Sequence, residues 1–201
     1  MSSDVATPVP LIAIALPDEE QGLLRAAGYD LLFTGVGKVN AAAVLARALA
    51  ERRHAGRGPR LVVNFGTAGS RRHDTGAMVA CDRFAQRDMD VSPLGFPHGH
   101  TPYDEHGGEL SFPPIFTGLP AGLCGTGDSF ETGAGMLACD IVDMEAYALA
   151  KVCRLDGIDF ACAKYVTDGA DHAAAGDWLS NLPRAAAGFL ALMQSLRDPT
   201  A

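Results

Sequence analysis

The hydrophobic pattern of this chain alternates between strand-like and helix-like segments, and this alternation restricts the fold more than any other feature. Continuous apolar runs that suit buried parallel strands occur at 11–16 (LIAIAL), 61–65 (LVVNF) and 160–167 (FACAKYVT). Helix-like segments rich in Ala and Leu lie at about 39–54, 144–155 and 178–196. The alternation predicts an α/β protein, with a sheet covered by helices on both faces.

Weaker signals complete this outline. Pro17 and the acids after it predict the start of a short helix that stops at Gly28. Further strands are expected at 29–34, 78–84, 118–125 and 140–142. Residues 86–114 are rich in Pro, Gly and His, and a loop of this length inside a compact domain is usually functional or disordered. We expect one domain over 1–201, with loose ends at 1–9 and 198–201.

Composition excludes several classes of protein. A net charge of −8 without a long basic run argues against nucleic acid as a partner. The apolar run at 11–16 is too short for a membrane span, so we expect a cytoplasmic protein. The five cysteines have no C-x-x-C spacing, and His98, His100 and His106 have no matching ligand set. We therefore expect neither a metal nor another cofactor.

Acidic residues follow several of the expected strands. Glu19 and Glu20 come after the first strand, Glu145 opens a late helix, and Asp168 ends the late strand at 160–167. In open α/β sheets, ligands bind beyond the carboxyl ends of the strands. Carboxylates that meet there suit glycoside-type cleavage, in which one acid protonates the leaving group and another activates water. Each acid taken alone is better explained as a helix cap than as a catalyst.

Six segments decide between these interpretations: PDEEQGLL, GVGKVNAAA, NFGTAGS, DMDVSPLGF, TGDSFE and VDMEAYALAKVC with its downstream YVTDGAD. In order and spacing they resemble the methylthioadenosine/S-adenosylhomocysteine nucleosidase branch of the nucleoside phosphorylase superfamily, from Leu11 to about Leu196. The resemblance implies a three-layer phosphorylase/hydrolase-like fold with a central mixed sheet flanked by helices. It also implies a purine nucleosidase, acting in purine and methionine salvage, that releases adenine and a free thioribose.

The resemblance also assigns three catalytic residues. It makes Glu20 the general base that activates water and Asp168 the general acid that protonates N7 of the purine. Glu145 would grip the ribose hydroxyls. Adenine leaves poorly as an anion, so protonation by a general acid is needed. General-acid catalysis typically raises the rate by ~10²–10⁴-fold.

The substrate-binding residues implied by the resemblance come from every part of the chain. Met144 would pack on the ribose near Thr67 and Thr167, and Phe130 would stack on adenine while the backbone of Phe130 and Glu131 reads its edge. Trp178 would close over the base, although it could equally pack as core. Leu94 and Pro102 match positions that reach into the 5'-substituent pocket of a neighbouring subunit, which would imply a homodimer. These residues are Thr67, Leu94, Pro102, Phe130, Glu131, Met144, Thr167 and Trp178.

Alternatives remain open from the sequence. Phosphorylases of the superfamily hold phosphate with arginines, one of them shortly before the G-[ST]-x-G turn, and here that position is Asn64. Hydrolysis is therefore favoured, although Arg71, Arg72 or Arg87 could fold back into the site. A phosphorylase, a hydrolase of another purine nucleoside such as futalosine, and a non-catalytic nucleoside-binding or storage protein are the alternatives. The segment before GVGKVN also lacks the hairpin that is usual in the family, a difference that bears on the substrate more than on the reaction.

Overall fold

The computed structural model describes residues 10–129, 138–169 and 174–197. Within these ranges eight strands form one mixed sheet in the order β2-β1-β3-β7-β6-β4-β5, and β8 pairs with both β3 and β4. The strands are β1 (Leu11–Ile14), β2 (Asp30–Phe33), β3 (Leu61–Gly69), β4 (Met78–Gln86), β5 (Leu110–Ser111), β6 (Ala121–Thr126), β7 (Ile141–Asp143) and β8 (Asp159–Asp168). The helices are α1 (Leu23–Ala26), α2 (Lys38–His54), α3 (Ala146–Asp156) and α4 (Ala174–Arg197), with 3-10 turns η1 (Pro17–Glu19) and η2 (Ser92–Leu94).

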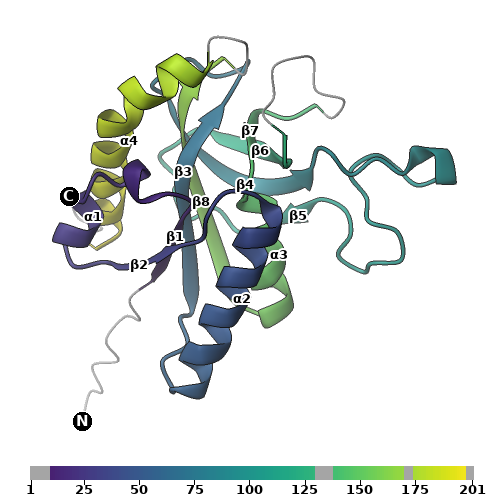
Figure 1. Cartoon of the computed structure of the whole chain (residues 1–201), viewed down its shortest axis with the longest axis horizontal. Coiled ribbons are helices and arrows are strands. Elements are labelled where there is room, and N and C mark those ends of the chain that lie inside the picture. Colours follow the sequence, from purple (N-terminus) through teal and green to yellow (C-terminus); the bar gives the residue numbers. More distant parts are fainter. Residues whose placement is uncertain (1–9, 130–137, 170–173, 198–201) are drawn as a thin grey trace.

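Helices cover both faces of the sheet, which gives the three layers that the alternating pattern predicts (Figure 1). Alternate residues of β1 and β3 point to opposite faces, since side chains alternate along a strand. Leu11 and Val62 pack with α2 and α3, whereas Ile12 and Val63 pack with α1 and α4. Two separate apolar cores result, one on each face of the sheet.

The longest pairing among the described strands is the parallel ladder between β3 and β8, which runs from Leu61 opposite Asp159 to Gly69 opposite Asp168. β3 is therefore longer than the apolar run at 61–65 predicts, because Gly66 to Gly69 stay in the sheet. The ladder shifts register between Ala68 and Gly69. It brings the end of β3 beside Asp168, where polar side chains gather.

The chain between β1 and β2 also differs from the prediction. The expected helix is divided into the 3-10 turn η1 and the four-residue α1, with Gly22 at a φ of 77° between them. Gly28 has a φ of 77° as well, and the chain turns there into β2. Among the described residues β2 is an edge strand, paired with β1 alone.

A segment that we call the arm, residues 88–109, extends away from the body of the molecule (Figure 1). Its only regular element is η2. Turn bonds stabilise it internally, from the Gly99 N–H to the Met89 carbonyl at 2.7 Å and from the Thr101 N–H to the Gly107 carbonyl at 2.8 Å. The arm corresponds to most of the Pro-, Gly- and His-rich stretch that the sequence singles out.

Candidate active site

A cavity of about 290 Å³ lies where the ends of several strands meet. This volume approaches the lower end of the usual range for small-molecule sites. The walls come from segments that are far apart in the sequence. The lining residues are Ala15, Leu16, Glu19, Val36, Thr67, Ala68, Gly69, Arg87, Ser129, Val142, Asp143, Met144, Glu145, Thr167, Asp168 and Trp178.

Glu19 supplies the carboxylate on the β1 side of the cavity. It is 4% exposed, and its Oε1 accepts hydrogen bonds from the Thr67 N–H and the Thr67 hydroxyl, both at 2.8 Å. Its Oε2 accepts the Leu16 N–H at 3.2 Å. Three donors therefore fix the orientation of this carboxylate.

Glu20, the residue that the resemblance assigns as the base, lies outside the cavity lining. Its Oε2 accepts the N–H groups of Leu24 and Arg25 at 3.0 and 3.2 Å, at the beginning of α1. A carboxylate there satisfies backbone donors that have no partner within the helix. The structure thus gives Glu20 a capping position and places Glu19 at the cavity.

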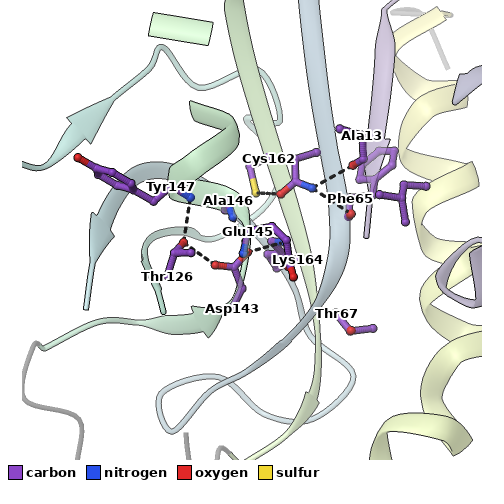
Figure 2. Close-up of polar contacts among 12 residues, drawn as sticks. Ala13, Phe65, Thr67, Thr126, Asp143, Glu145, Ala146, Tyr147, Cys162 and Lys164 are labelled. Carbon is purple, nitrogen blue, oxygen red and sulfur yellow. Dashed lines mark hydrogen bonds and ion pairs between the residues drawn. The ribbon is translucent and has the colours of Figure 1, made fainter. Parts of the chain in front are cut away.

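Asp143, which lines the cavity, forms a buried ion pair with Lys164, and both residues are drawn in Figure 2. Lys164 Nζ lies 2.8 Å from Asp143 Oδ2, and both side chains are 1% exposed. Asp143 also accepts the Thr126 hydroxyl at 2.6 Å and the Ala146 N–H at 2.8 Å. Burial by itself would raise the pKa of Asp143, but the Lys164 ammonium and these donors hold it below its usual value. Burial likewise opposes the charge on Lys164, yet Asp143 raises its pKa well above the ordinary value.

Gly66 lies beside both Lys164 and Glu19. A methyl group added at Gly66 would lie 3.0 Å from Lys164 Nζ and 3.4 Å from Glu19 Oε1. The lack of a side chain at this position therefore leaves room for both the ammonium group and the carboxylate.

Glu145 follows β7 and is 8% exposed. Its Oε1 accepts the N–H of Gly37 at 2.9 Å, at the start of α2. Gly37 has a φ of 94°, a conformation that favours glycine, so GVGKVN is a turn that directs this N–H toward the carboxylate. Burial and the nearby Asp143 charge raise the pKa of Glu145 to about 7, although Lys164 and the Gly37 bond oppose the shift. This side chain therefore changes charge near neutral pH.

Asp168 lies at the end of β8, on another side of the same cavity, and is 6% exposed. The Thr167 hydroxyl donates to Asp168 Oδ2 at 2.8 Å, and the Asp168 carbonyl accepts the Ser70 N–H at 3.0 Å. Both the side chain and the backbone of Asp168 are therefore held in place. Of the three acids expected to meet here, the structure brings together Glu145 and Asp168, with Glu19 in place of Glu20.

The remaining predicted binding residues fall into three groups. Thr67, Met144, Thr167 and Trp178 line the cavity. Phe130 and Glu131 lie outside the described residues. Leu94 and Pro102 lie on the arm and do not line this cavity.

Arg87 lies at the cavity, as the sequence left open for it. Its guanidinium donates to the Ser129 hydroxyl at 3.2 Å and to the Gly127 carbonyl at 3.4 Å. Asn64, the residue in place of a phosphate-binding arginine, is 1% exposed and donates to the Ala13 carbonyl at 2.9 Å. Asn64 therefore connects β3 to β1, which is a structural role.

Sequence reasoning missed Asp143 and Lys164. A lysine in the middle of the apolar run FACAKYV was a usable signal, because a buried lysine needs a charged partner. The first acid of VDMEA could have been proposed as that partner.

Two searches of the described residues complete the description of the molecule. In residues 10–129, 138–169 and 174–197, no group of three or more His, Cys, Asp or Glu side chains is arranged to hold a metal ion. None of the helices within these ranges combines the length and the apolar character needed to cross a membrane.

Comparisons with known proteins agree with this fold. A model of the phosphorylase superfamily matches residues 27–120 and 126–196. The 5'-methylthioadenosine/S-adenosylhomocysteine nucleosidase of Haemophilus influenzae (strain PittEE) is 29% identical over 198 residues, covering 89% of this chain and 84% of that protein. The nucleosidase of the same name from Neisseria meningitidis, solved with methylthio-immucillin-A, has a TM-score of 0.79 at 24% identity and covers 95% of this chain and 99% of its own. A futalosine hydrolase mutant of Helicobacter pylori has a TM-score of 0.79 at 19% identity, covering 95% and 100%.

Proposed function

The chain belongs to the phosphorylase superfamily, and we propose that it hydrolyses the N-glycosidic bond of 5'-methylthioadenosine or S-adenosylhomocysteine to adenine and the free thioribose. One observation carries the proposal: Glu19, Glu145 and Asp168 line a single cavity. Carboxylates on different sides of one site suit the separate acid and base steps of glycoside-type cleavage. The Haemophilus relative, a nucleosidase of these two compounds by name, supports the choice of substrate.

In the proposed reaction, Glu19 accepts a proton from a water molecule as that water attacks C1' of the ribose. Asp168 donates a proton to N7 as the bond from C1' to N9 breaks, so adenine leaves as a neutral base. Glu145 accepts hydrogen bonds from the ribose hydroxyls, and Lys164 offsets part of the negative charge of the site. The base role goes to Glu19 rather than Glu20 because Glu20 bonds to the start of α1.

Water is the proposed nucleophile because Asn64 and Arg87, two positions considered for binding phosphate, have other partners in the structure. Asn64 is bonded within the sheet, and the guanidinium of Arg87 is bonded to Ser129 and Gly127. A phosphate ion beside the Glu19 carboxylate would also meet like charge. These arrangements favour hydrolysis over phosphorolysis.

Adenine release from 5'-methylthioadenosine, with and without phosphate, tests the proposal. We expect release without phosphate and free methylthioribose as the second product. A strict phosphate requirement with a sugar 1-phosphate product would make the enzyme a phosphorylase. Turnover of futalosine alone would keep the reaction and replace the substrate.

A cytoplasmic homodimer belongs to the same proposal. Leu94 is 73% exposed and Tyr103 is 98% exposed, both on the arm. Exposed apolar side chains on a projecting segment are typical of an interface. Leu94 and Pro102 would then complete the 5'-substituent side of a second subunit's pocket. Sedimentation equilibrium tests this, with a monomer as the contradicting result.

A further inference from the structure

We propose that Trp178 is a positioning residue for the reaction, which acts through Thr67 to orient Glu19. The inference rests on the proposed function, in which Glu19 is the base. Trp178 Nε1 donates to Thr67 Oγ1 at 2.8 Å, and Thr67 Oγ1 donates to Glu19 Oε1 at 2.8 Å. The three side chains thus form a continuous hydrogen-bonded chain along the cavity wall.

The chemistry of the indole fixes the direction of this chain. An indole N–H can only donate, so the Thr67 oxygen must act as the acceptor from Trp178. The single hydroxyl proton of Thr67 is then left for Glu19. Without the indole N–H the hydroxyl could rotate, and the carboxylate would lose a directed donor.

The bond from Thr67 matters because of the oxygen that receives it. Oε1 of Glu19 accepts both the Thr67 hydroxyl and the Thr67 N–H, which fixes the plane of the carboxylate. A fixed plane also fixes the directions of the remaining lone pairs, one of which must take the proton from water. A misplaced base loses rate more than it loses binding.

The contacts of α4 with the sheet support this role for Trp178. α4 packs against the strand that carries Thr67, since the Phe189 ring of α4 stacks on Phe65 of β3 at a centroid distance of 4.7 Å. Asn181 of the same helix donates to the Thr167 carbonyl at 3.2 Å. The helix is therefore anchored to both β3 and β8, and the indole has a defined place relative to Thr67.

The two possible roles of Trp178, covering the bound nucleoside and orienting the base, predict different effects on kcat and KM. If Trp178 only covers the bound nucleoside, Trp178→Phe should raise KM or leave both constants unchanged, because phenylalanine keeps an aromatic ring. If Trp178 orients the base through Thr67, the same change should lower kcat and leave KM nearly constant. The loss of one net hydrogen bond corresponds to about two- to tenfold in kcat.

The experiment measures kcat and KM for 5'-methylthioadenosine in Trp178→Phe, Thr67→Val, the double variant and the conservative variant Thr67→Ser. We expect Thr67→Val to lower kcat at least as much as Trp178→Phe, and the double variant to match Thr67→Val alone. Thr67→Ser keeps the hydroxyl and should recover most of the kcat that Thr67→Val loses. Leu179→Ala, at an exposed position of α4 next to Trp178, is the control and should leave kcat and KM unchanged. Additive losses, or a change confined to KM, would overturn the inference.

Trp178 is the only tryptophan of the chain, so its fluorescence reports on this bond directly. Thr67→Val should shift its emission in the unliganded protein, and unchanged emission would contradict the bond. Turnover that Trp178→Phe leaves intact would overturn the inference while the proposed function stands. No turnover by the unaltered enzyme would instead overturn the proposed function, and this inference with it.

Discussion

The cavity wall and the arm differ in how their side chains find partners. In the wall, Glu19, Asp143 and Lys164 are buried and bonded within the chain. On the arm, Leu94 and Tyr103 are exposed. The buried groups of the wall therefore find their partners within the chain, whereas part of the arm stays exposed. Substitutions in the wall should affect catalysis and stability, whereas those on the arm should affect association.

The largest effect on the rate of adenine release is expected at Asp168, the proposed general acid. Asp168→Asn removes the proton donor but keeps the shape of the side chain, so adenine release should fall by about 10²–10⁴-fold. Binding of an unreactive nucleoside analogue, followed by Trp178 fluorescence, should survive. Asp159→Asn, at the exposed beginning of the same strand, is the matched control. Normal turnover by Asp168→Asn would refute the mechanism.

Adjacent glutamates provide the next test of the wall. Glu19→Gln should lower kcat by roughly 10²-fold or more, because the base is lost. Glu20→Gln should keep most activity and reduce the free energy of unfolding by about 1 kcal/mol, because it weakens the bonds at the start of α1. Steady-state kinetics and urea unfolding separate the two outcomes. The reverse pattern would return the base role to Glu20.

The two regions also offer two ion pairs of different burial. Lys164→Met leaves Asp143 charged and unpaired in the interior, so the free energy of unfolding should fall by about 3–5 kcal/mol. Lys151→Met breaks the partly exposed pair with Asp104 on the arm and should cost about 0–1 kcal/mol. Urea unfolding compares them. Equal losses would mean that the Lys164 pair is not sealed from water.

Glu145, on the cavity wall, makes the free energy of unfolding of the protein depend on pH. Its pKa is raised from 4.5 to about 7, so the folded state binds this proton more tightly than the unfolded state. The resulting stability is fully present below pH 4.5 and is lost as the pH rises through 7. It amounts to about 3 kcal/mol at most. Unfolding of Glu145→Gln across this range should lack that loss, and an unchanged slope would contradict the pKa.

The smallest effect on the folded chain is expected on the arm. Leu94→Asp should change the free energy of unfolding of the subunit by less than about 0.5 kcal/mol, because the side chain is exposed. It should nevertheless weaken dimerisation and raise KM, if Leu94 reaches a second pocket. Ultracentrifugation and kinetics over a dilution series measure both. A dimer that is unaffected by the change would place the interface elsewhere.

Sequence predicted the fold more completely than the site. The apolar runs at 11–16 and 160–167 mark β1 and β8, because buried strands need such runs. The end of β3 was missed, because Gly66 and Gly69 are poor strand formers that stay in the sheet through pairing with β8. Pairing of this kind depends on a distant segment, so no local pattern reveals it.

In the site, the sequence predicted the type of residue but not which of two adjacent residues faces the cavity. The segment PDEE predicts a carboxylate after β1. The backbone of η1 and of the turn after it determines which glutamate faces the cavity. A 3-10 turn places side chains at a different angle from an α-helix, so the choice between Glu19 and Glu20 depends on one residue of backbone geometry. Lys164 stands out in the sequence as a charged residue within an apolar strand. Only the structure shows that Asp143 is its partner.

The bonds of the site cross long stretches of chain, with consequences for biosynthesis. Gly37 and Glu145 are separated by 108 positions, and Thr67 and Trp178 by 111. No contiguous half of the protein contains the partners of every catalytic group. A nascent chain should therefore remain inert until the segment bearing Trp178 has left the ribosome and α4 has docked. Nucleosidase activity would then serve as a sensitive indicator of complete folding in stalled, truncated or split versions of this protein.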